Sequence, residues 1–217
     1  DLIQKLRESS SESPELEARR LIKRHLGIDW AEIVSDPGKI LEDSSLNAIK
    51  SDLERRVKGE PLSRIEGIRE FHGLEFIVTP DTIDPRPETE ILVDRALKLF
   101  HGKHPVKVLD MGTGAGCIII TLLKAWPETQ GLATDISPGA LETAKKNARQ
   151  HGVAGRLSFK QADWGEGITG PFDLILSNPP YIRHSDIESL QKEVRNHDPI
   201  LALSGGFDGL EAYKKIF

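Results

Sequence analysis

The feature that most constrains the fold is a glycine-rich turn between a short apolar strand and an apolar helix. The strand is predicted over Val106 to Leu109, the turn reads Asp110-Met-Gly-Thr-Gly-Ala-Gly116, and the helix is predicted from Cys117 to Ala125. Glycines let the backbone approach a ligand closely, so this arrangement is typical of nucleotide-binding α/β sheets. The spacing is tighter than the Gly-x-Gly-x-x-Gly of dinucleotide enzymes, and no Lys-Ser/Thr pair follows to make a phosphate loop.

Two acidic residues follow the next predicted strands. About 20 residues beyond the turn a second strand ends at Asp135, whose carboxylate can accept hydrogen bonds from both hydroxyls of a ribose. A third strand, Leu157 to Gln161, leads to Asp163 and Trp164, which suit the amine and the ring face of adenine. The pattern therefore predicts a cofactor that contains a nucleoside.

A fourth strand, Phe172 to Ser177, leads into a rigid polar turn, Asn178-Pro-Pro-Tyr181. The strand is so apolar that we expect it to be buried on both faces of a parallel sheet. The Asn178 side-chain oxygen and the Pro179 carbonyl can accept both N–H bonds of a planar NH2 group, while Tyr181 stacks on its plane. A bare Asn-Pro-Pro run is as often a plain turn, but the preceding strand and the glycine turn favour a site for an amide or an exocyclic amine.

The first third of the chain has a helical pattern and no strand pattern. Apolar residues recur at helical spacing from Pro14 to His25 and again from Ser44 or Ser45, as N-cap, to Gly59. Charges of both signs cover the outer faces of these segments, which is more typical of a solvated surface than of a partner site. The sequence therefore predicts a small all-α bundle at the start of the chain.

A hairpin and a stiff arm are expected to join the bundle to the sheet. The hairpin is predicted within Ile68 to Pro80, around His72-Gly73. In the arm, Asp84-Pro-Arg-Pro-Glu-Thr-Glu90, the two prolines hold the chain extended before a helix from Glu88 to Phe100. The predicted domains are residues 1–66, helical; residues 67–86, hairpin and linker; and residues 87–217, the sheet.

Composition narrows the class of protein. The chain has 217 residues, a net charge of −5 and a single cysteine, Cys117, so it has no internal disulfide and no cysteine zinc cluster. Its seven histidines form no His-x-x-x-His pair, and no apolar run approaches the ~18–20 residues that cross a bilayer. We expect a cytoplasmic protein with no metal and no membrane association.

Together these motifs resemble the class I S-adenosylmethionine-dependent methyltransferases that act on planar nitrogens. The chain is more closely similar to the release factor glutamine methyltransferase (PrmC/HemK) family, and the resemblance covers nearly its whole length. It rests on the helical first domain, Phe71-His-Gly-Leu74, Pro85-Arg-Pro-Glu-Thr-Glu90, Asp163-Trp164 and Leu201-Ala-Leu…Gly-Gly…Asp-Gly-Leu210. One departure is Asp84, where the family often has an aliphatic residue before Pro85.

The resemblance implies a fold, an activity and a set of site residues. It implies a Rossmann-like class I sheet and methyl transfer from S-adenosylmethionine to the glutamine amide of the Gly-Gly-Gln motif in peptide-chain release factors. It implies that the catalytic residues are Asn178, Pro179 and Tyr181. The methyl donor is expected to contact Asp110, Gly112, Thr113, Gly114, Ala115, Gly116, Asp135, Asp163, Trp164 and Asn178. The glutamine substrate is expected to contact Asn178, Pro179, Pro180, Tyr181, Arg86 and Pro87. Recognition of the release factor is expected of the helical domain, in a monomer that binds no nucleic acid.

Two alternatives from other classes stay open. A nucleic-acid amino-methyltransferase, acting on adenine N6 or guanine N2, would use the same polar turn on a flipped base. Such enzymes need several phosphate contacts, and the net charge of −5 argues against them. A non-catalytic binding module is disfavoured because every motif expected of catalysis is intact; donor binding without methyl transfer would identify it.

The sequence also predicts a longer native protein. Four strands fill one half of a doubly wound sheet, and the apolar fourth strand would lie uncovered at its edge. Gly209 to Phe217 reads as an amphipathic helix without a Gly or Asn cap. We therefore expect roughly 60 further residues with about three strands. The chain does not begin with Met, so we expect its start to be trimmed as well.

Overall fold

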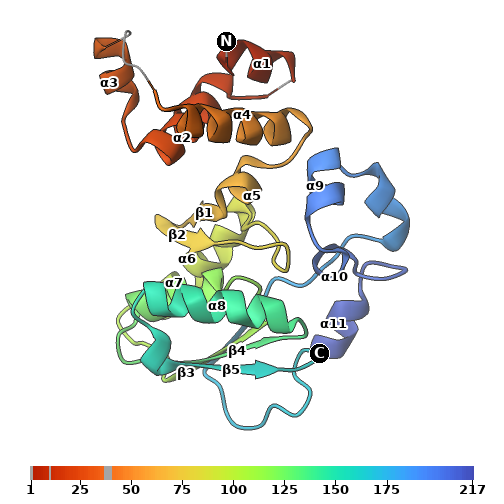
Figure 1. The fold of residues 1–217 in the computed structure, drawn as a ribbon. Coiled ribbons are helices and arrows are strands. Elements are labelled where there is room, and N and C mark those ends of the chain that lie inside the picture. Colours follow the sequence, from red (N-terminus) through yellow and green to blue (C-terminus); the bar gives the residue numbers. More distant parts are fainter. Residues whose placement is uncertain (1, 10, 37–40) are drawn as a thin grey trace. The chain divides into compact units, whose positions relative to one another are not determined.

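The structure is a computed structural model that describes residues 2–9, 11–36 and 41–217. It divides into two compact units, Asp1–Glu66 and Gly67–Phe217 (Figure 1). The boundary lies between the last helix of the first unit and the first strand of the second. No helix of the described ranges combines the length and the apolar character that a membrane span requires.

The described part of the first unit is helical, as expected. Its helices are α1 (Leu2–Glu8), α2 (Pro14–Leu26), α3 (Trp30–Ser35), α4 (Asp43–Val57) and α5 (Leu62–Glu66). Helix α2 confirms its predicted bounds, because Pro14 opens it and Gly27 ends it in a left-handed conformation, φ 65°. Helix α4 begins earlier than predicted: Glu42, rather than Ser44 or Ser45, is its N-cap, since the Glu42 carbonyl accepts the first helical hydrogen bond.

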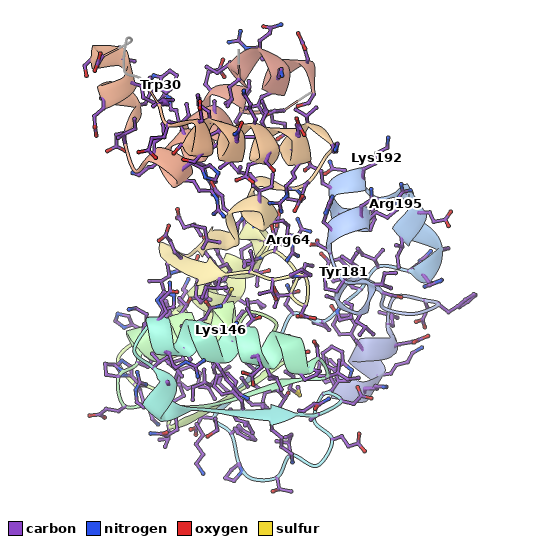
Figure 2. The ribbon with its side chains drawn as sticks, in the orientation of Figure 1. Trp30, Arg64, Lys146, Tyr181, Lys192 and Arg195 are labelled. Atoms are coloured by element: carbon purple, nitrogen blue, oxygen red, sulfur yellow. The ribbon has the colours of Figure 1, made fainter. Side chains whose placement is uncertain are left out.

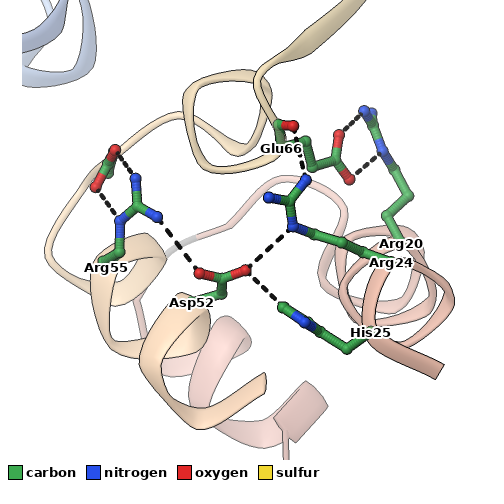
Figure 3. Close-up of polar contacts among 7 residues, drawn as sticks. Arg20, Arg24, His25, Asp52, Arg55 and Glu66 are labelled. Carbon is green, nitrogen blue, oxygen red and sulfur yellow. Dashed lines mark hydrogen bonds and ion pairs between the residues drawn. The ribbon is translucent and has the colours of Figure 1, made fainter. Parts of the chain in front are cut away.

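A polar network ties α2, α4 and α5 together (Figure 3). Asp52 of α4 is only 8% exposed; its carboxylate lies 2.7 Å from His25 Nε2 and pairs with Arg24 and Arg55 at 3.5 and 3.4 Å. Arg20 forms an ion pair with Glu66 at the end of α5. These contacts supplement two small apolar clusters, one of Leu6, Ala18 and Leu53 and the other of Leu21, Leu62 and Ile65.

The second unit begins with the predicted hairpin, β1 (Ile68–Phe71) and β2 (Leu74–Ile77). The strands are antiparallel, and the turn residues His72 and Gly73 both have positive φ, 51° and 72°, as a tight two-residue hairpin turn requires. The hairpin is fastened by Asn147 of α8 (Pro138–Gln150), whose side chain is fully buried. Asn147 Oδ1 accepts from the Ile77 N–H at 2.8 Å, and its Nδ2 donates to the carbonyls of Ile77 and Ala115. One side chain thus joins the hairpin to the glycine turn.

A parallel four-stranded sheet forms the centre of this unit and confirms the expected α/β fold. Its strands are β3 (Lys107–Met111), β4 (Gln130–Asp135), β5 (Leu157–Gln161) and β6 (Leu174–Ser177), in the order β5-β4-β3-β6. Helix α7 (Cys117–Ala125) has the predicted bounds and lies with α8 over one face of the sheet (Figure 1). Helix α6 (Glu90–Leu99) contributes Val93 and Ala96 to the hydrophobic core that α7 forms with the sheet. The predicted helix from Glu88 instead starts as a 3-10 turn, η1 (Pro87–Thr89), because Pro87 occupies its first position.

Strand β6 departs from the expected burial. It pairs with β3 alone and therefore lies at an edge of the described sheet. Leu176 is 8% exposed and packs on the core, but Ile175 is 53% exposed, so the prediction of burial on both faces is wrong. Successive side chains of a strand point to opposite faces, and α6, α7 and α8 contribute to the core on the Leu176 side only.

The chain after β6 forms short helices instead of another strand. These are η3 (His184–Ser189), α9 (Lys192–His197), α10 (Ile200–Leu203) and α11 (Glu211–Ile216); η2 (Ala154–Arg156) precedes β5. The backbone of Ile182 donates to Leu203 at 3.1 Å and accepts from Gly205 at 2.8 Å. This pairing returns the chain to the turn that follows β6.

Candidate functional site

A cavity of about 670 Å³ lies at the carboxyl edge of the sheet. Parallel strands end together at this edge, so residues distant in the chain meet there. The expected site residues that line the cavity are Arg86, Gly112, Gly114, Asp135, Asp163, Trp164, Asn178, Pro179, Pro180 and Tyr181. The structure therefore brings members of both expected sets, donor and acceptor, to one cavity.

Five expected residues do not line the cavity. Asp110 and Ala115 are buried, 0% and 4% exposed, behind the turn, and Gly116, φ 83°, starts α7. Thr113 donates its hydroxyl to Asp110 Oδ2 at 2.7 Å, and Pro87 opens η1. These five residues lie outside the cavity lining, and their expected contacts with a ligand stay predictions.

The carboxylate of Asp135 is held by the glycine turn. Its Oδ2 accepts from the Gly114 N–H and its Oδ1 from the Ser137 N–H, both at 2.9 Å. Burial raises the pKa of Asp135 above the usual value of an aspartate, while these hydrogen bonds oppose the shift. Each carboxylate oxygen has a further lone pair, so Asp135 can still accept hydrogen bonds from a ligand in the cavity.

Asp110 is a buried acid with one unsatisfied oxygen. Burial raises the pKa of Asp110 to about 7, the charge of Asp135 adds to the rise, and the Thr113 hydroxyl opposes it. Asp110 Oδ1 has no hydrogen-bond partner among the residues that the structure describes. An unpaired buried oxygen of this kind is costly to the fold.

Trp164 covers the glycine turn in a strained conformation. Its φ is 54°, which residues with a side chain rarely adopt, and its carbonyl accepts from the Thr134 hydroxyl at 3.1 Å. A Cβ on Gly112 would lie 3.1 Å from the indole ring, closer than an ordinary contact, and the φ of Gly112, 70°, also favours glycine. Backbone strain of this kind costs of the order of 1–3 kcal/mol and is concentrated at functional sites.

The turn after β6 is connected to the arm. Asn178 Nδ2 donates to the Thr89 hydroxyl oxygen at 2.9 Å, and Arg86 pairs with the buried carboxylate of Asp198 at 2.5 Å. Tyr181 is 63% exposed, and in Figure 2 it lies at the base of the segment that carries α9 and α10. The arm and the polar turn are therefore in direct contact through Asn178 and Thr89.

A glycine loop supports the same turn from behind. A Cβ on Gly205 would lie 2.8 Å from the Pro180 carbonyl oxygen, and one on Gly209 would lie 2.7 Å from that of Tyr181. Such approach distances exclude any side chain unless the backbone moves. The loop therefore limits where the carbonyls of the turn can lie.

Sequence reasoning missed Thr89, Asp198 and Lys215 as residues near the site. Thr89 contacts Asn178 from 89 residues away, Asp198 contacts Arg86 from 112, and Lys215 contacts Asp163 from 52. No local pattern marks such pairs. Thr89 had one available signal, its position within the Pro85-Arg-Pro-Glu-Thr-Glu90 arm.

Comparisons with known proteins identify the relatives of this chain. The methyltransferase small domain model matches residues 81–202, and the PrmC N-terminal domain model matches residues 1–67. The release factor glutamine methyltransferase of Bradyrhizobium diazoefficiens is 43% identical, over 99% of this chain and 73% of that protein. The protein of the same name from Agrobacterium fabrum is 44% identical, over 94% of this chain and 72% of that protein.

A solved structure shares the fold. The catalytic domain of hMettl16, solved in complex with MAT2A 3'UTR hairpin 6, has a TM-score of 0.53 and 18% identity, over 88% of this chain and 73% of that chain. With the parallel sheet, the glycine turn and the acidic strand ends, these matches define a class I S-adenosylmethionine-dependent methyltransferase. Within that class, the chain belongs to the release factor glutamine methyltransferase family.

Proposed function

We propose that this protein transfers the methyl group of S-adenosylmethionine to the glutamine side-chain amide of the Gly-Gly-Gln motif in peptide-chain release factors. The observation that carries the proposal is that Asp135, on the donor side, and Asn178, on the acceptor side, line one cavity. The names of the relatives from Bradyrhizobium diazoefficiens and Agrobacterium fabrum support the choice of acceptor.

The donor side fits S-adenosylmethionine in shape and in charge. Gly112 and Gly114 line the cavity without side chains, and Asp135 can accept hydrogen bonds from ribose hydroxyls. Oδ1 of Asp110, which has no partner among the described residues, lies behind the turn. A cationic group bound near it would lower the pKa of the Asp110 carboxyl. When bound, S-adenosylmethionine supplies an electrophilic methyl group on a sulfonium.

The acceptor side must orient a poor nucleophile. An amide nitrogen has a delocalised lone pair, so Asn178 Oδ1 and the Pro179 carbonyl would accept its two N–H bonds while Tyr181 packs on its plane. Placing that nitrogen ~3–3.5 Å from the methyl carbon, in line with the departing sulfur, contributes on the order of 7–11 kcal/mol. The two acceptor oxygens also stabilise the positive charge that develops on nitrogen. In the transfer, the carbon–sulfur bond would break as the carbon–nitrogen bond forms, and the nitrogen would then lose one of its two protons to water.

In the same proposal, residues 1–66 recognise the release factor and residues 87–217 form the catalytic domain. The PrmC N-terminal model matches residues 1–67, and the donor-side residues that line the cavity all follow residue 105. Arg86 and Pro87 belong to the arm at the acceptor side and are proposed to guide the glutamine. We also propose that the protein is a monomer, which light scattering would measure, and that it lies in the cytoplasm, which cell fractionation would measure.

The function is tested by tritiated methyl transfer from S-adenosylmethionine to purified release factors, in parallel with tRNA, rRNA and DNA. We expect label in the peptide that contains Gly-Gly-Gln, located on glutamine by mass spectrometry. Label in a nucleic acid with none in a release factor would overturn the proposal. Asn178→Ala should lower kcat by about 100-fold or more and leave the affinity for S-adenosylhomocysteine near that of the unmodified protein. Asn196→Ala, at an exposed asparagine that does not line the cavity, is the matched control.

A further inference from the structure

The side-chain amide of Asn178 is anchored by a threonine of the arm. Asn178 Nδ2 donates to Thr89 Oγ1 at 2.9 Å. Thr89 is the N-cap of α6, a position where a threonine hydroxyl commonly accepts a backbone N–H of the first helical turn. Here the Thr89 side chain makes no such cap hydrogen bond. Thr89 has helical dihedral angles, φ −69° and ψ −22°, that continue η1 into α6, and its side-chain oxygen accepts from Asn178.

The segment that carries Thr89 is fixed on several sides. The Thr89 N–H donates to the Arg86 carbonyl at 2.9 Å, and the Arg86 guanidinium pairs with Asp198, whose side chain is 3% exposed. The next residue, Glu90, accepts from the His72 N–H of the hairpin at 2.8 Å. A hydrogen bond to Thr89 therefore connects Asn178 to a rigid point of the fold.

We infer that Thr89 is a positioning residue that holds the plane of the Asn178 amide for the acceptor; the inference rests on the proposed function. The hydrogen bond that Asn178 Oδ1 accepts from the methyl acceptor requires Oδ1 to lie in the plane of the incoming NH2 group. Without a restraint, the terminal side-chain torsion angle of asparagine takes a broad range of values. A hydroxyl can both donate and accept, so Thr89 fixes the plane of the amide. The N–H groups of the acceptor then select the orientation with Oδ1 toward them, and Nδ2 remains on Thr89.

The test compares Thr89→Val, which keeps the shape and removes the oxygen, with Thr89→Ser, which keeps the oxygen. We expect Thr89→Val to lower kcat by roughly 10- to 100-fold, because small misplacements in a reacting geometry have effects of this size. KM for the release factor and Kd for S-adenosylhomocysteine should stay within about threefold of the unmodified protein, since neither depends on developing charge. Thr89→Ser should restore kcat to within about threefold. Thr169→Val, at an exposed threonine of the loop before β6, is the matched control.

A double-substitution cycle separates the inference from the function on which it rests. If Thr89 acts through Asn178, Thr89→Val should cause no further loss in an Asn178→Ala background. Independent, multiplying losses would overturn the positioning role, as would an unchanged kcat in Thr89→Val. If Asn178→Ala itself keeps full turnover, the proposed acceptor turn fails instead.

A spectroscopic measurement reads the same contact without any methyl acceptor. The side-chain NH2 signals of Asn178, in protein saturated with S-adenosylhomocysteine, should show protection from exchange with water. Thr89→Val should abolish that protection, and Thr89→Ser should retain it. Equal exchange rates in all three proteins would overturn the inference. A melting curve for each variant identifies any loss of fold.

Discussion

The carboxylate of Asp163 forms an ion pair with the ammonium group of Lys215 in α11. Both residues line the cavity, Asp163 at the end where adenine is expected. The pair engages Asp163 Oδ2, which leaves Oδ1 able to accept a hydrogen bond from the adenine amine. The hydrogen bond with Asp163 raises the pKa of Lys215, so the ammonium stays charged at neutral pH.

This pair predicts unequal effects on donor affinity. Asp163→Ala should weaken S-adenosylhomocysteine binding by about 1–2 kcal/mol, because it removes the acceptor itself. Lys215→Met should weaken binding only about two- to threefold, since it removes the group that orients the carboxylate and solvent screens the exposed pair. Titration calorimetry measures both. Tighter binding by Lys215→Met would show that the ammonium competes with adenine.

Asp135 is predicted to contribute the larger part of donor recognition. Asp135→Ala removes two charge-assisted hydrogen bonds to the ribose, so S-adenosylhomocysteine binding should weaken by about 2–4 kcal/mol. Trp164→Ala should cost about 1 kcal/mol if the ring only packs on adenine. Calorimetry with Glu128→Ala, at an exposed carboxylate of the same unit, provides the control. An unchanged Kd for Asp135→Ala would remove this residue from the site.

The raised pKa of Asp110 predicts how stability changes with pH. The pKa of Asp110 rises from 3.8 to about 7 on folding, so the folded protein binds more protons between these values and loses stability as pH increases. This single group should lower the free energy of unfolding by about 2–3 kcal/mol between pH 5 and pH 8. Urea unfolding of ligand-free protein measures it. Asp110→Asn should show a correspondingly smaller decline, and an identical slope would contradict the assignment.

The close packing of Gly205 against the acceptor turn predicts a loss of turnover. In Gly205→Ala the new methyl group would lie 2.7 Å from the Gly209 carbonyl oxygen and 2.8 Å from that of Pro180, so the backbone must move. We expect kcat to fall by roughly tenfold or more while donor affinity is retained. Gly155→Ala is a matched control, because a Cβ there meets nothing within 4 Å. Equal activity of the two variants would show that the loop does not position the turn.

The buried carboxylate of Asp52 predicts a stability effect confined to the helical unit. Asp52→Ala leaves His25, Arg24 and Arg55 without their shared acceptor, which should cost about 2–4 kcal/mol after allowing for the partly exposed arginines. Hydrogen exchange of α2 and α4 would locate the loss. Glu15→Ala, which breaks the exposed pair with Arg7, should leave exchange in these helices nearly unchanged. Similar exchange in both variants would contradict a special role for Asp52.

The sequence by itself determined the elements whose information is local. The start of α7 follows from an apolar run that begins after Gly116, and the extent of β5 follows from a short alternating run before Asp163. The β1–β2 turn follows from His72-Gly73. The order of motifs along the chain also predicted that the glycine turn, Asp135 and Asn178 belong to one site. Parallel strands all end at one edge of the sheet, so strand ends alone carry this information.

Only the tertiary structure decided which side chains meet and how much of each is covered. Ile175 and Leu176 look alike in sequence, yet they are 53% and 8% exposed because β6 has one neighbouring strand and one packed face. The contacts of Asn178 with Thr89, Arg86 with Asp198 and Asp163 with Lys215 join segments 89, 112 and 52 residues apart. Such contacts depend on strand order and loop closure, which the packing of the whole unit sets. No periodic sequence pattern indicates them.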